Sequence, residues 1–450
     1  MRNTPRQVQG IAPSPPAVPS VAVLVELLRN DASGGHMKCW ERFAEAAADR
    51  RDGEAGIDLT VYVLGHREHV EELSPRVRFV ALRPVLSTAA AMPVVGGVDI
   101  TDLAPHHPRL ARLLPRHDVW HLTHSFAFAA TAVRLAGAAS VAPRPGLVAS
   151  LHTDVPALAS VYTRQVVGKV PGLSRLADGP AAGLPHLVEE LARHRRDRLL
   201  RRCDRVLASS PHAREEMHAI MDPARVSLLR RGVDHERFRP DPAAREELVR
   251  RHRIPGDRPL VLFVGRVDAS KGAPLLAEAI RRLLHRRLCA HLVIVGAGAE
   301  TDHITRLLGP DVTHLGRQPQ DRLAQVYAGC DVFAFPSHTE TVGNVVAEAM
   351  ACGLPVVLPE RAETTQWLAA PGHDGLVVRK DTPAGWARAL EGLLVRPDAR
   401  RLMGRRAART ARTRHPTWAR VLEEDLLPVW QEVAGTGRRA GAHPSPSGAH

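Results

Sequence analysis

The segment Asp331–Pro359, DVFAFPSHTETVGNVVAEAMACGLPVVLP, combines residue types that suit the binding of an anionic ligand. Its pattern predicts a buried strand at Val332–Phe335, then a polar loop, and then a helix that begins near Gly343. The first turn of such a helix presents backbone N–H groups without partners inside the helix, and its dipole favours an anion there. A glycine at this point lets the backbone approach a ligand closely. The residues expected to offer these groups are Thr341, Val342, Gly343 and Asn344.

Two glutamates flank this helix start and extend the expected site. Glu340 precedes the helix and is expected to point into the same crevice, and Glu348 lies about one turn inside the helix. A carboxylate at the second position can accept hydrogen bonds from the two vicinal hydroxyls of a ribose. Each feature taken singly also fits an ordinary helix start with a threonine cap and a surface acid. Their combination directly after a strand favours a binding site for a nucleotide-linked substrate.

A second segment, Leu260–Gly272, LVLFVGRVDASKG, places cationic side chains in the same kind of position. The pattern predicts a strand that runs into Gly265 and Arg266, and a following helix opened by Lys271-Gly272. Arg266 and Lys271 can converge on a diphosphate and stabilise the charge of a departing phosphate without a metal ion. An isolated Arg and Lys after a strand are more often solvated charges. They support a binding site here because both are expected to face the same predicted cleft.

The first half of the chain contributes two further candidates at strand ends. The run Val21–Leu28 leads to a Gly34-Gly35 turn that opens a helix and suits close approach by a sugar or a phosphate. A plain strand-to-helix turn is the alternative interpretation of this feature. The run Leu147–Leu151 is followed by His152 and Asp154, which could orient a sugar hydroxyl and anchor it. Gly34, Gly35 and Asp154 are therefore candidates for the sugar or acceptor side of a site.

These segments must be positioned by two series of short apolar runs that alternate with helical segments along the chain. Runs bounded by glycine or proline and alternating with helices indicate parallel sheets covered on both faces. The first series is Val21–Leu28, Leu59–Leu64, Val77–Leu82, Val119–Leu122, Leu147–Leu151 and Arg205–Ala208, and the second is Leu260–Val264, His291–Val295, Val332–Phe335, Leu354–Leu358 and Leu376–Val378. Because ligands bind outside the carboxyl ends of parallel strands, two facing sheets would gather the candidate residues around one cleft.

The sequence therefore predicts an α/β protein with two doubly wound, Rossmann-like domains that face each other across a cleft. We expect the first domain over residues 20–240, a polar linker over 241–256 and the second domain over 257–416. A last helix over 417–433 carries an apolar stripe and is expected to pack back on the first domain. The ends, 1–19 and 434–450, are expected to be disordered tails. The stripe consists of Trp418, Val421, Leu422, Leu426 and Trp430.

Composition narrows the functional classes. Aromatic residues make up 4% of the chain, which argues against a module that stacks bases, so we expect no nucleic-acid partner. The formal net charge is +13, but arginines occur along the whole chain, as on solvated helix faces. The densest basic stretch, 191–205, LARHRRDRLLRRCDR, is interpreted as a solvated helix, with a peripheral membrane contact as the alternative.

Cysteine usage and the N-terminal sequence bear on the compartment. The cysteines form no CxxC pair and predict reduced thiols, not a disulfide framework or a zinc site. Residues 1–20 lack the apolar run of a signal peptide, and no stretch approaches the roughly 18 consecutive apolar residues of a membrane span. We therefore expect a cytoplasmic protein, at the inner membrane face if the basic helix touches lipid. The five cysteines are Cys39, Cys203, Cys289, Cys330 and Cys352.

Over about residues 20–430, these segments resemble the family 4 retaining glycosyltransferases, which have the GT-B fold. PSHTETVGNVVAEAMACGLPVV is similar to that family's E-x7-E signature, and GRVDASKG is similar to its phosphate-binding Arg/Lys loop. RRGVDHERFRP, at Arg230–Pro240, resembles the family's interdomain segment, and SLHTD resembles the stretch with its active-site histidine. Within the family, the TET-x-GN-VV-x-EAM sequence pattern is most similar to that of bacterial mannosyltransferase-like and sulfolipid-synthase-like members.

The resemblance implies a role for each candidate residue. Arg266 and Lys271 would bind the donor diphosphate, while Glu340 would contact hydroxyls of the donor sugar and Glu348 the ribose. His152 would sit beside the transferred sugar. The catalytic residues would be His152, Glu340, Arg266 and Lys271, and the donor-binding residues would also include Gly265, Thr341, Val342, Gly343, Asn344 and Glu348.

The resemblance also implies chemistry without an obligatory metal or other cofactor. The family has mostly been assigned front-face retention, in which the leaving phosphate helps to deprotonate the acceptor. Two departures affect the identity of the donor: Val342 stands where the signature usually has Phe, and Glu360–Thr364 replaces a loop that is glycine-rich in many members.

The sequence thus predicts a hexosyltransferase that moves a hexose, with retention, from GDP-mannose or a UDP-hexose to a hydroxyl of a small-molecule or lipid acceptor. A GT-B sugar-nucleotide epimerase shares the fold and the diphosphate site and is one alternative. A catalytically silent sugar-nucleotide-binding protein is the other.

Overall fold

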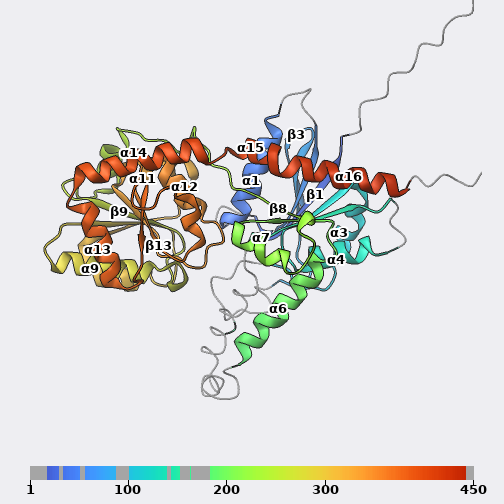
Figure 1. The fold of residues 1–450 in the computed structure, drawn as a ribbon, viewed down its shortest axis with the longest axis horizontal. Helices are drawn as coiled ribbons and strands as arrows, with labels where there is room; N and C mark the ends of the chain where they lie inside the picture. Colours follow the sequence, from blue (N-terminus) through green and yellow to red (C-terminus); the bar gives the residue numbers. More distant parts are fainter. Residues whose placement is uncertain are drawn as a thin grey trace, which may run out of the picture.

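The computed structural model describes residues 18–29, 34–50, 56–87, 101–138, 143–152, 163 and 183–441, which form two α/β domains side by side (Figure 1). The first domain is built on an eight-stranded sheet with the strand order β3-β4-β2-β1-β5-β6-β7-β8. Its neighbouring strands are parallel except for β3 and β4, which are antiparallel at one edge. The strands are β1 (Ser20–Leu28), β2 (Asp58–Leu64), β3 (His69–Ser74), β4 (Val77–Leu82), β5 (Val119–Leu122), β6 (Gly146–Ser150), β7 (Arg205–Ala208) and β8 (Val226–Leu228).

The first sheet is buried on both faces. Val21 of β1 points into a core that includes α1 (Gly35–Ala48), and the next residue, Ala22, points into the opposite core with α4 (Ala127–Ala136). Because both faces are covered, the strands read as continuous apolar runs and not as alternating patterns. Among the described residues of this domain, the other helices are α3 (Pro108–Leu113), α6 (Leu184–Leu200) and α7 (Pro211–His218).

The second domain contains a six-stranded parallel sheet with the order β11-β10-β9-β12-β13-β14. Every residue of its inner strands β9 and β10 is buried, which explains their almost entirely apolar sequences. The strands are β9 (Leu260–Val264), β10 (His291–Val295), β11 (Val312–Gly316), β12 (Val332–Ala334), β13 (Val356–Pro359) and β14 (Gly375–Val378). The helices after β9 are α9 (Ala273–His285), α10 (Thr301–Leu308), α11 (Gln320–Gly329), α12 (Asn344–Ala351), α13 (Pro383–Leu394) and α14 (Pro397–Arg414).

The segment 241–256, which we expected to be a linker, instead belongs to the second domain. It forms helix α8 (Ala244–His252), and its Leu248 and Ile254 are buried in the core of that domain. Arg245 pairs with Asp331 at 2.8 Å, directly before β12. The segment is polar and bounded by prolines, but it forms a short helix in which Ala244 and Leu248 are buried.

The C-terminal helices cross from the second domain to the first (Figure 1). After α14, the chain forms α15 (Trp418–Val421), a π-helical turn (Leu422–Leu426) and α16 (Leu427–Gly441), whose apolar residues lie in one core with β1 and α1. We expected the helix to end at 433 and a disordered tail to follow, but α16 continues to Gly441. Val433 and Ala434 are buried against the first domain, and this packing carries the helix past the expected end. Within the part of the chain that the structure describes, no helix has the length and apolar character needed to cross a bilayer.

Candidate active site

The loop after β9 holds Arg266 and Lys271 through a single carboxylate. The side chain of Asp268 accepts a hydrogen bond from the Lys271 backbone N–H at 3.1 Å and so caps the short 3-10 turn Ala269–Lys271. The same carboxylate pairs with Arg266 Nε at 3.1 Å, and Arg266 Nη2 donates to Ser270 Oγ at 3.2 Å. The Arg266 guanidinium is therefore oriented, yet it remains partly exposed and able to meet an anionic ligand.

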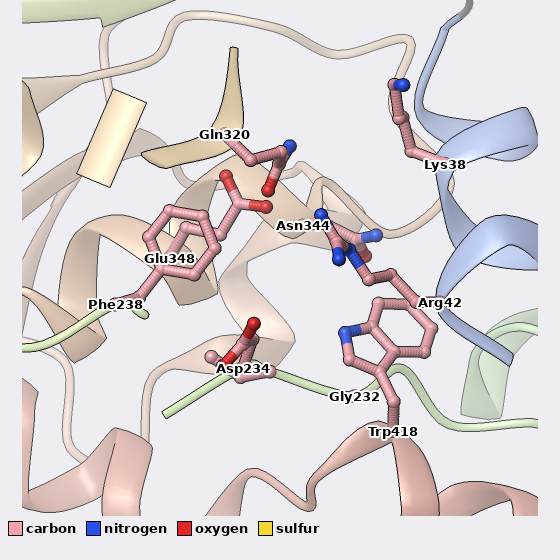
Figure 2. Close-up of a pocket in the computed structure, with 10 residues that line it drawn as sticks. Lys38, Arg42, Gly232, Asp234, Phe238, Gln320, Asn344, Glu348 and Trp418 are labelled. Atoms are coloured by element: carbon pink, nitrogen blue, oxygen red, sulfur yellow. The ribbon is translucent and has the colours of Figure 1, made fainter. Parts of the chain in front are cut away.

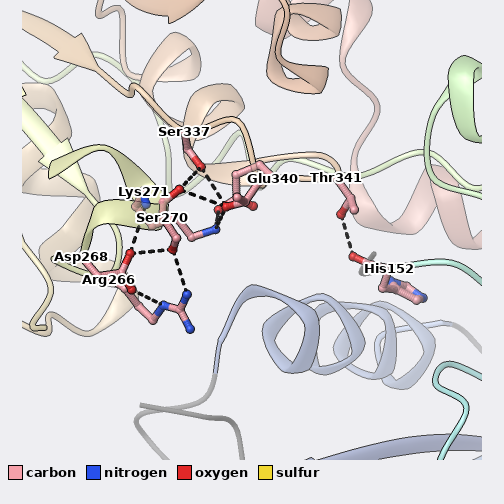
Figure 3. Close-up of polar contacts among 9 residues, drawn as sticks. His152, Arg266, Asp268, Ser270, Lys271, Ser337, Glu340 and Thr341 are labelled. Carbon is pink, nitrogen blue, oxygen red and sulfur yellow. Dashed lines mark hydrogen bonds and ion pairs between the residues drawn. The ribbon is translucent and has the colours of Figure 1, made fainter. Parts of the chain in front are cut away.

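Lys271 and Glu340 meet between two loops that are far apart in the sequence (Figure 3). Lys271 Nζ lies 2.6 Å from Glu340 Oε1 and donates to Thr339 Oγ1 at 3.3 Å. Thr339 Oγ1 in turn donates to the Ser270 carbonyl at 3.1 Å. The loops after β9 and β12 are thus in direct contact. A partly exposed ion pair of this kind contributes about 0–1 kcal/mol, so a ligand can replace it at low cost.

The start of α12 requires a glycine. Gly343 has a φ of +69°, and a Cβ at this position would lie 2.5 Å from Thr364 Cγ2. Asn344 is the first helical residue, and its buried Oδ1 has no hydrogen-bond partner among the described residues. We expected Val342 to contact the sugar donor, but Val342 is only 5% exposed. Its carbonyl already accepts a hydrogen bond from Trp367 Nε1 at 2.7 Å. Of its groups, the backbone N–H is the one left to contact a sugar-nucleotide donor.

Glu348 lies in a pocket that both domains line (Figure 2). Tyr327 Oη donates to Glu348 Oε2 at 3.2 Å, and burial raises the pKa of Glu348 to about 7. Lys38 and Arg42 of α1 reach the pocket from the first domain. The other lining residues are Gly232, Val233, Asp234, Phe238, Gln320, Asn344 and Trp418.

Of the described first-domain site candidates, His152 forms a hydrogen bond with the second domain. Thr341 Oγ1 donates to the backbone carbonyl of His152 at 2.6 Å. In Figure 3, the imidazole of His152 points away from Lys271 and Glu340. At Gly34 and Gly35, a Cβ would meet nothing within 4 Å, which leaves open space at the N-terminus of α1. Asp154 lies outside the described residues.

Both ring nitrogens of His152 are engaged inside the first domain. Arg231 Nη2 donates to His152 Nδ1 at 2.6 Å, so the ring proton of the neutral imidazole must be on Nε2, which lies 2.6 Å from Ser150 Oγ. Burial, together with His36 and Arg231, holds the pKa of His152 well below its usual range. Contact between this neutral imidazole and a sugar hydroxyl would require one of the two hydrogen bonds to open.

Sequence reasoning missed several residues that contact His152 or its neighbours, His36, His124 and Arg231 among them. His36 stacks on His152 at 4.2 Å between ring centroids and on His124 at 4.3 Å. Arg231 joins this stack through His152. A signal was present for His124, because the sequence HLTHSF ends a strand in the same way as SLHTD does. For His36 and Arg231, only the fold brings the side chains together.

A buried glutamate fixes the loop that carries His124. Glu26 of β1 accepts hydrogen bonds from the backbone N–H groups of Phe126, Phe128 and Ala129, at 3.2, 2.8 and 3.0 Å. It thereby satisfies the first turn of α4, which has no side-chain cap of its own. Burial raises the pKa of Glu26 to about 8 despite these three donors.

No metal-binding constellation is present within the described residues: they contain no group of three or more His, Cys, Asp or Glu side chains arranged to hold an ion.

Two family models match this chain. One, described as Glycosyltransferase Family 4, covers residues 41–237, and one, described as Glycosyl transferases group 1, covers residues 258–396. A GDP-mannose-dependent alpha-mannosyltransferase of Mycolicibacterium smegmatis is 35% identical over 291 residues, which are 64% of this chain and 70% of that protein. A D-inositol 3-phosphate glycosyltransferase 2 of Catenulispora acidiphila is 34% identical over 271 residues, 56% of this chain. The chain spans 60% of the length of that relative.

Solved structures share the two-domain arrangement at low sequence identity. Sucrose-phosphate synthase from Thermosynechococcus elongatus superposes with a TM-score of 0.62 at 20% identity, over 94% of this chain and 99% of that one. Anabaena HepE in complex with UDP-glucose superposes with a TM-score of 0.61 at 17% identity, over 94% and 100%. The fold is therefore GT-B. On the family models and the relatives together, the chain belongs to glycosyltransferase family 4.

Proposed function

We propose that this chain is a retaining hexosyltransferase that moves a sugar from a nucleoside-diphosphate donor to a hydroxyl of a small-molecule or lipid acceptor. The observation that carries the proposal is the convergence of Arg266, Lys271 and Glu340 beside the N-terminus of α12. Two cations and free helix N–H groups suit a diphosphate, and the adjacent carboxylate suits sugar hydroxyls. Preorganised donors of this kind stabilise the charge that develops on the leaving phosphate.

The donor is proposed to be GDP-mannose or a UDP-hexose. Support for the first comes from the relative named as GDP-mannose-dependent, and support for the second comes from the HepE structure titled as a complex with UDP-glucose. The pocket at Glu348 supports either, because a carboxylate there can accept hydrogen bonds from the ribose that both donors contain.

We further propose that the reaction needs no metal ion or other cofactor. Arg266 and Lys271 can supply the positive charge that a divalent cation provides in other sugar-nucleotide sites. If this is correct, EDTA leaves turnover largely intact. Loss of turnover on chelation, restored by Mg²⁺ or Mn²⁺, would contradict it.

The test of the activity is incubation of the purified protein with a panel of nucleotide sugars, with and without hydroxyl acceptors, followed by detection of free GDP or UDP. Release that depends on an acceptor supports the transferase, and the anomeric configuration of the product by NMR tests retention. Conversion of the donor without an acceptor would indicate the epimerase. Donor binding without either reaction would indicate a silent binding protein.

A peripheral membrane contact is proposed for α6. Leu184, Leu187 and Leu191 share one face of this helix and are 39%, 55% and 61% exposed. Arg195 and Arg198 continue the same face, so apolar and cationic groups lie together as on membrane-surface helices.

Sedimentation with vesicles tests this contact. We expect binding to phosphatidylglycerol vesicles and much weaker binding to phosphatidylcholine vesicles, because anionic lipid adds electrostatic attraction. Leu187→Glu/Leu191→Glu should abolish this binding. Equal sedimentation of the variant and the parent protein would leave α6 as the solvated helix of the alternative interpretation.

A further inference from the structure

Two consecutive arginines after β8 have opposite environments. Arg230 pairs with Asp425 and Glu424 of the C-terminal helices, both at 2.6 Å, and lies partly exposed. Arg231 is 5% exposed and makes no ion pair with any acid of the described chain. Its Nη2 donates to the neutral ring of His152, and its buried Nη1 has no hydrogen-bond partner within the described part of the chain. A buried cation without a counter-charge costs several kcal/mol, so it calls for a reason.

Other buried polar atoms without partners lie on residues that connect to Arg231 through its hydrogen-bond partner His152. Both ring nitrogens of His36, the indole Nε1 of Trp40 and Nε2 of His121 are buried and make no hydrogen bond among the described residues. These residues belong to one cluster, because His36 and Trp40 each contact the ring of His152, at 4.2 and 5.6 Å between centroids, and Trp40 contacts His121 at 5.1 Å. Buried polar groups in native proteins are almost always paired, so this concentration points to a missing partner.

The charge decides what kind of partner is missing. Bound water can satisfy a neutral imidazole or indole, but it does not neutralise the guanidinium of Arg231. The imidazoles of His36 and His152 are themselves neutral, because burial lowers their pKa values. The cluster therefore combines one cation with neutral N–H donors, which is the donor set that an oxyanion requires.

We propose that Arg231, with N–H groups of His36 and Trp40, binds an oxyanion, a phosphate or a carboxylate, that the acceptor carries. This inference rests on the proposed function, which places the acceptor on the first domain. All members of the cluster belong to the first domain or the segment directly after β8, whereas the groups for the donor diphosphate, Arg266 and Lys271, belong to the second. Because Arg231 is buried here, the anion reaches it in a more open conformation. In that opening, the hydrogen bond from Thr341 Oγ1 to the His152 carbonyl, which joins the second domain to this cluster, would break.

Thermal unfolding of the full chain tests the site with inorganic phosphate as the probe and potassium chloride of equal ionic strength as the reference. We expect phosphate to raise the melting temperature of the parent protein by a few degrees, since a ligand that binds only the folded state stabilises it. Arg231→Met should lose this rise, while the exposed-site control Arg282→Met on α9 should keep it. In chloride, Arg231→Met should be at least as stable as the parent protein, because an unpaired buried charge has been removed.

A second set of measurements separates the sources of the anion. An Arg266→Ala/Lys271→Ala background removes both cations of the proposed donor site, and the phosphate effect should persist in it. It should also persist under saturating GDP or UDP if the anion belongs to the acceptor. Its loss under nucleotide would assign Arg231 to the donor diphosphate and contradict the acceptor assignment.

Two results would overturn the site itself: no phosphate effect in the parent protein, or an equal effect in Arg231→Met. Should Arg231→Met fail to fold, Arg231→Lys keeps the charge and should retain part of the phosphate effect, whereas complete loss there would also contradict the site. No sugar donor enters these measurements. A chain that binds phosphate through Arg231 but transfers no sugar would refute the proposed function alone.

Discussion

At the scale of single residues, Glu348 is the proposed ribose-binding group, and we expect its protonation to affect donor binding. Its carboxyl lies in the pocket between the domains, hydrogen-bonded by Tyr327, and burial raises its pKa to about 7. A raised pKa means that the folded protein holds this carboxyl protonated below neutrality. A protonated carboxyl has lost part of its capacity to accept hydrogen bonds from ribose hydroxyls.

We therefore predict that donor affinity increases with pH, by about tenfold between about pH 6 and pH 8, and then levels off. Isothermal titration calorimetry with the donor across this range measures it. Glu348→Gln keeps the shape of the side chain but does not titrate, so its affinity should be lower at high pH and nearly independent of pH. The same pH slope in the variant as in the parent protein would show that another group is responsible.

The residue scale is also where sequence reasoning reached its limit. Arg266, Lys271 and Glu340 were predictable because each follows a recognisable apolar run, and the structure places them within hydrogen-bonding distance of their neighbours. Arg231 could not be predicted in the same way. Its burial depends on the packing of His36 and His152, which come from distant parts of the chain.

At the scale of elements, the proposed donor-binding loop between β12 and α12 depends on the helix start at Gly343. The φ of +69° disfavours any other residue, and a Cβ would collide with Thr364 at 2.5 Å. We predict that Gly343→Ala destabilises the protein by roughly 1–3 kcal/mol and weakens donor binding, because the first turn of α12 must shift.

The matched control is Gly392→Ala. Gly392 lies in α13 with a right-handed conformation, and a Cβ there would meet nothing within 4 Å. This change should stabilise the protein by up to about 1 kcal/mol, as in ordinary helix interiors. Chemical denaturation of both variants measures the difference. An unchanged free energy of unfolding and unchanged donor affinity in Gly343→Ala would contradict the role given to this glycine.

The elements themselves were largely predictable where the apolar run was long. The expected and observed bounds of β4, β5, β7, β9 and β10 coincide. Of these strands, β5, β9 and β10 are buried along their whole length, which gives them the clearest apolar signal. The antiparallel edge strand β3 was missed, since its HVEELS sequence is mostly exposed and carries little apolar signal. Helix α8 was missed for a similar reason: only a few of its residues are buried, so its sequence reads as a polar linker.

At the scale of the whole molecule, the chain ties its two domains together at the C-terminus. The core of the second domain extends to Ala411, whereas Val421, Leu422, Leu426 and Trp430 belong to a core of the first domain. Trp430 Nε1 also donates to His121 Nδ1 at 2.9 Å. The last helices are therefore part of the first domain's core and not an appended arm.

We predict that truncation after Pro416 destabilises the first domain selectively. The cut uncovers several large apolar side chains of the first core, each of which contributes about 1.5–3 kcal/mol when buried. Differential scanning calorimetry should show a lost or strongly lowered transition for the first domain. The second domain, which keeps its own core, should retain binding of GDP or UDP, and a thermogram identical to that of the full chain would contradict this division.

The central claim is that Arg266 and Lys271 hold the departing diphosphate during sugar transfer. The measurement that tests it most directly is the acceptor-dependent rate of GDP or UDP release by the parent protein, Arg266→Ala, Lys271→Ala and the exposed-site control Arg282→Ala, all with normal circular dichroism. The account predicts a loss of about 100-fold or more in each of the first two variants, since one preorganised donor contributes about 3 kcal/mol, and an unchanged rate in the control. Parent-level release by both Arg266→Ala and Lys271→Ala would contradict it.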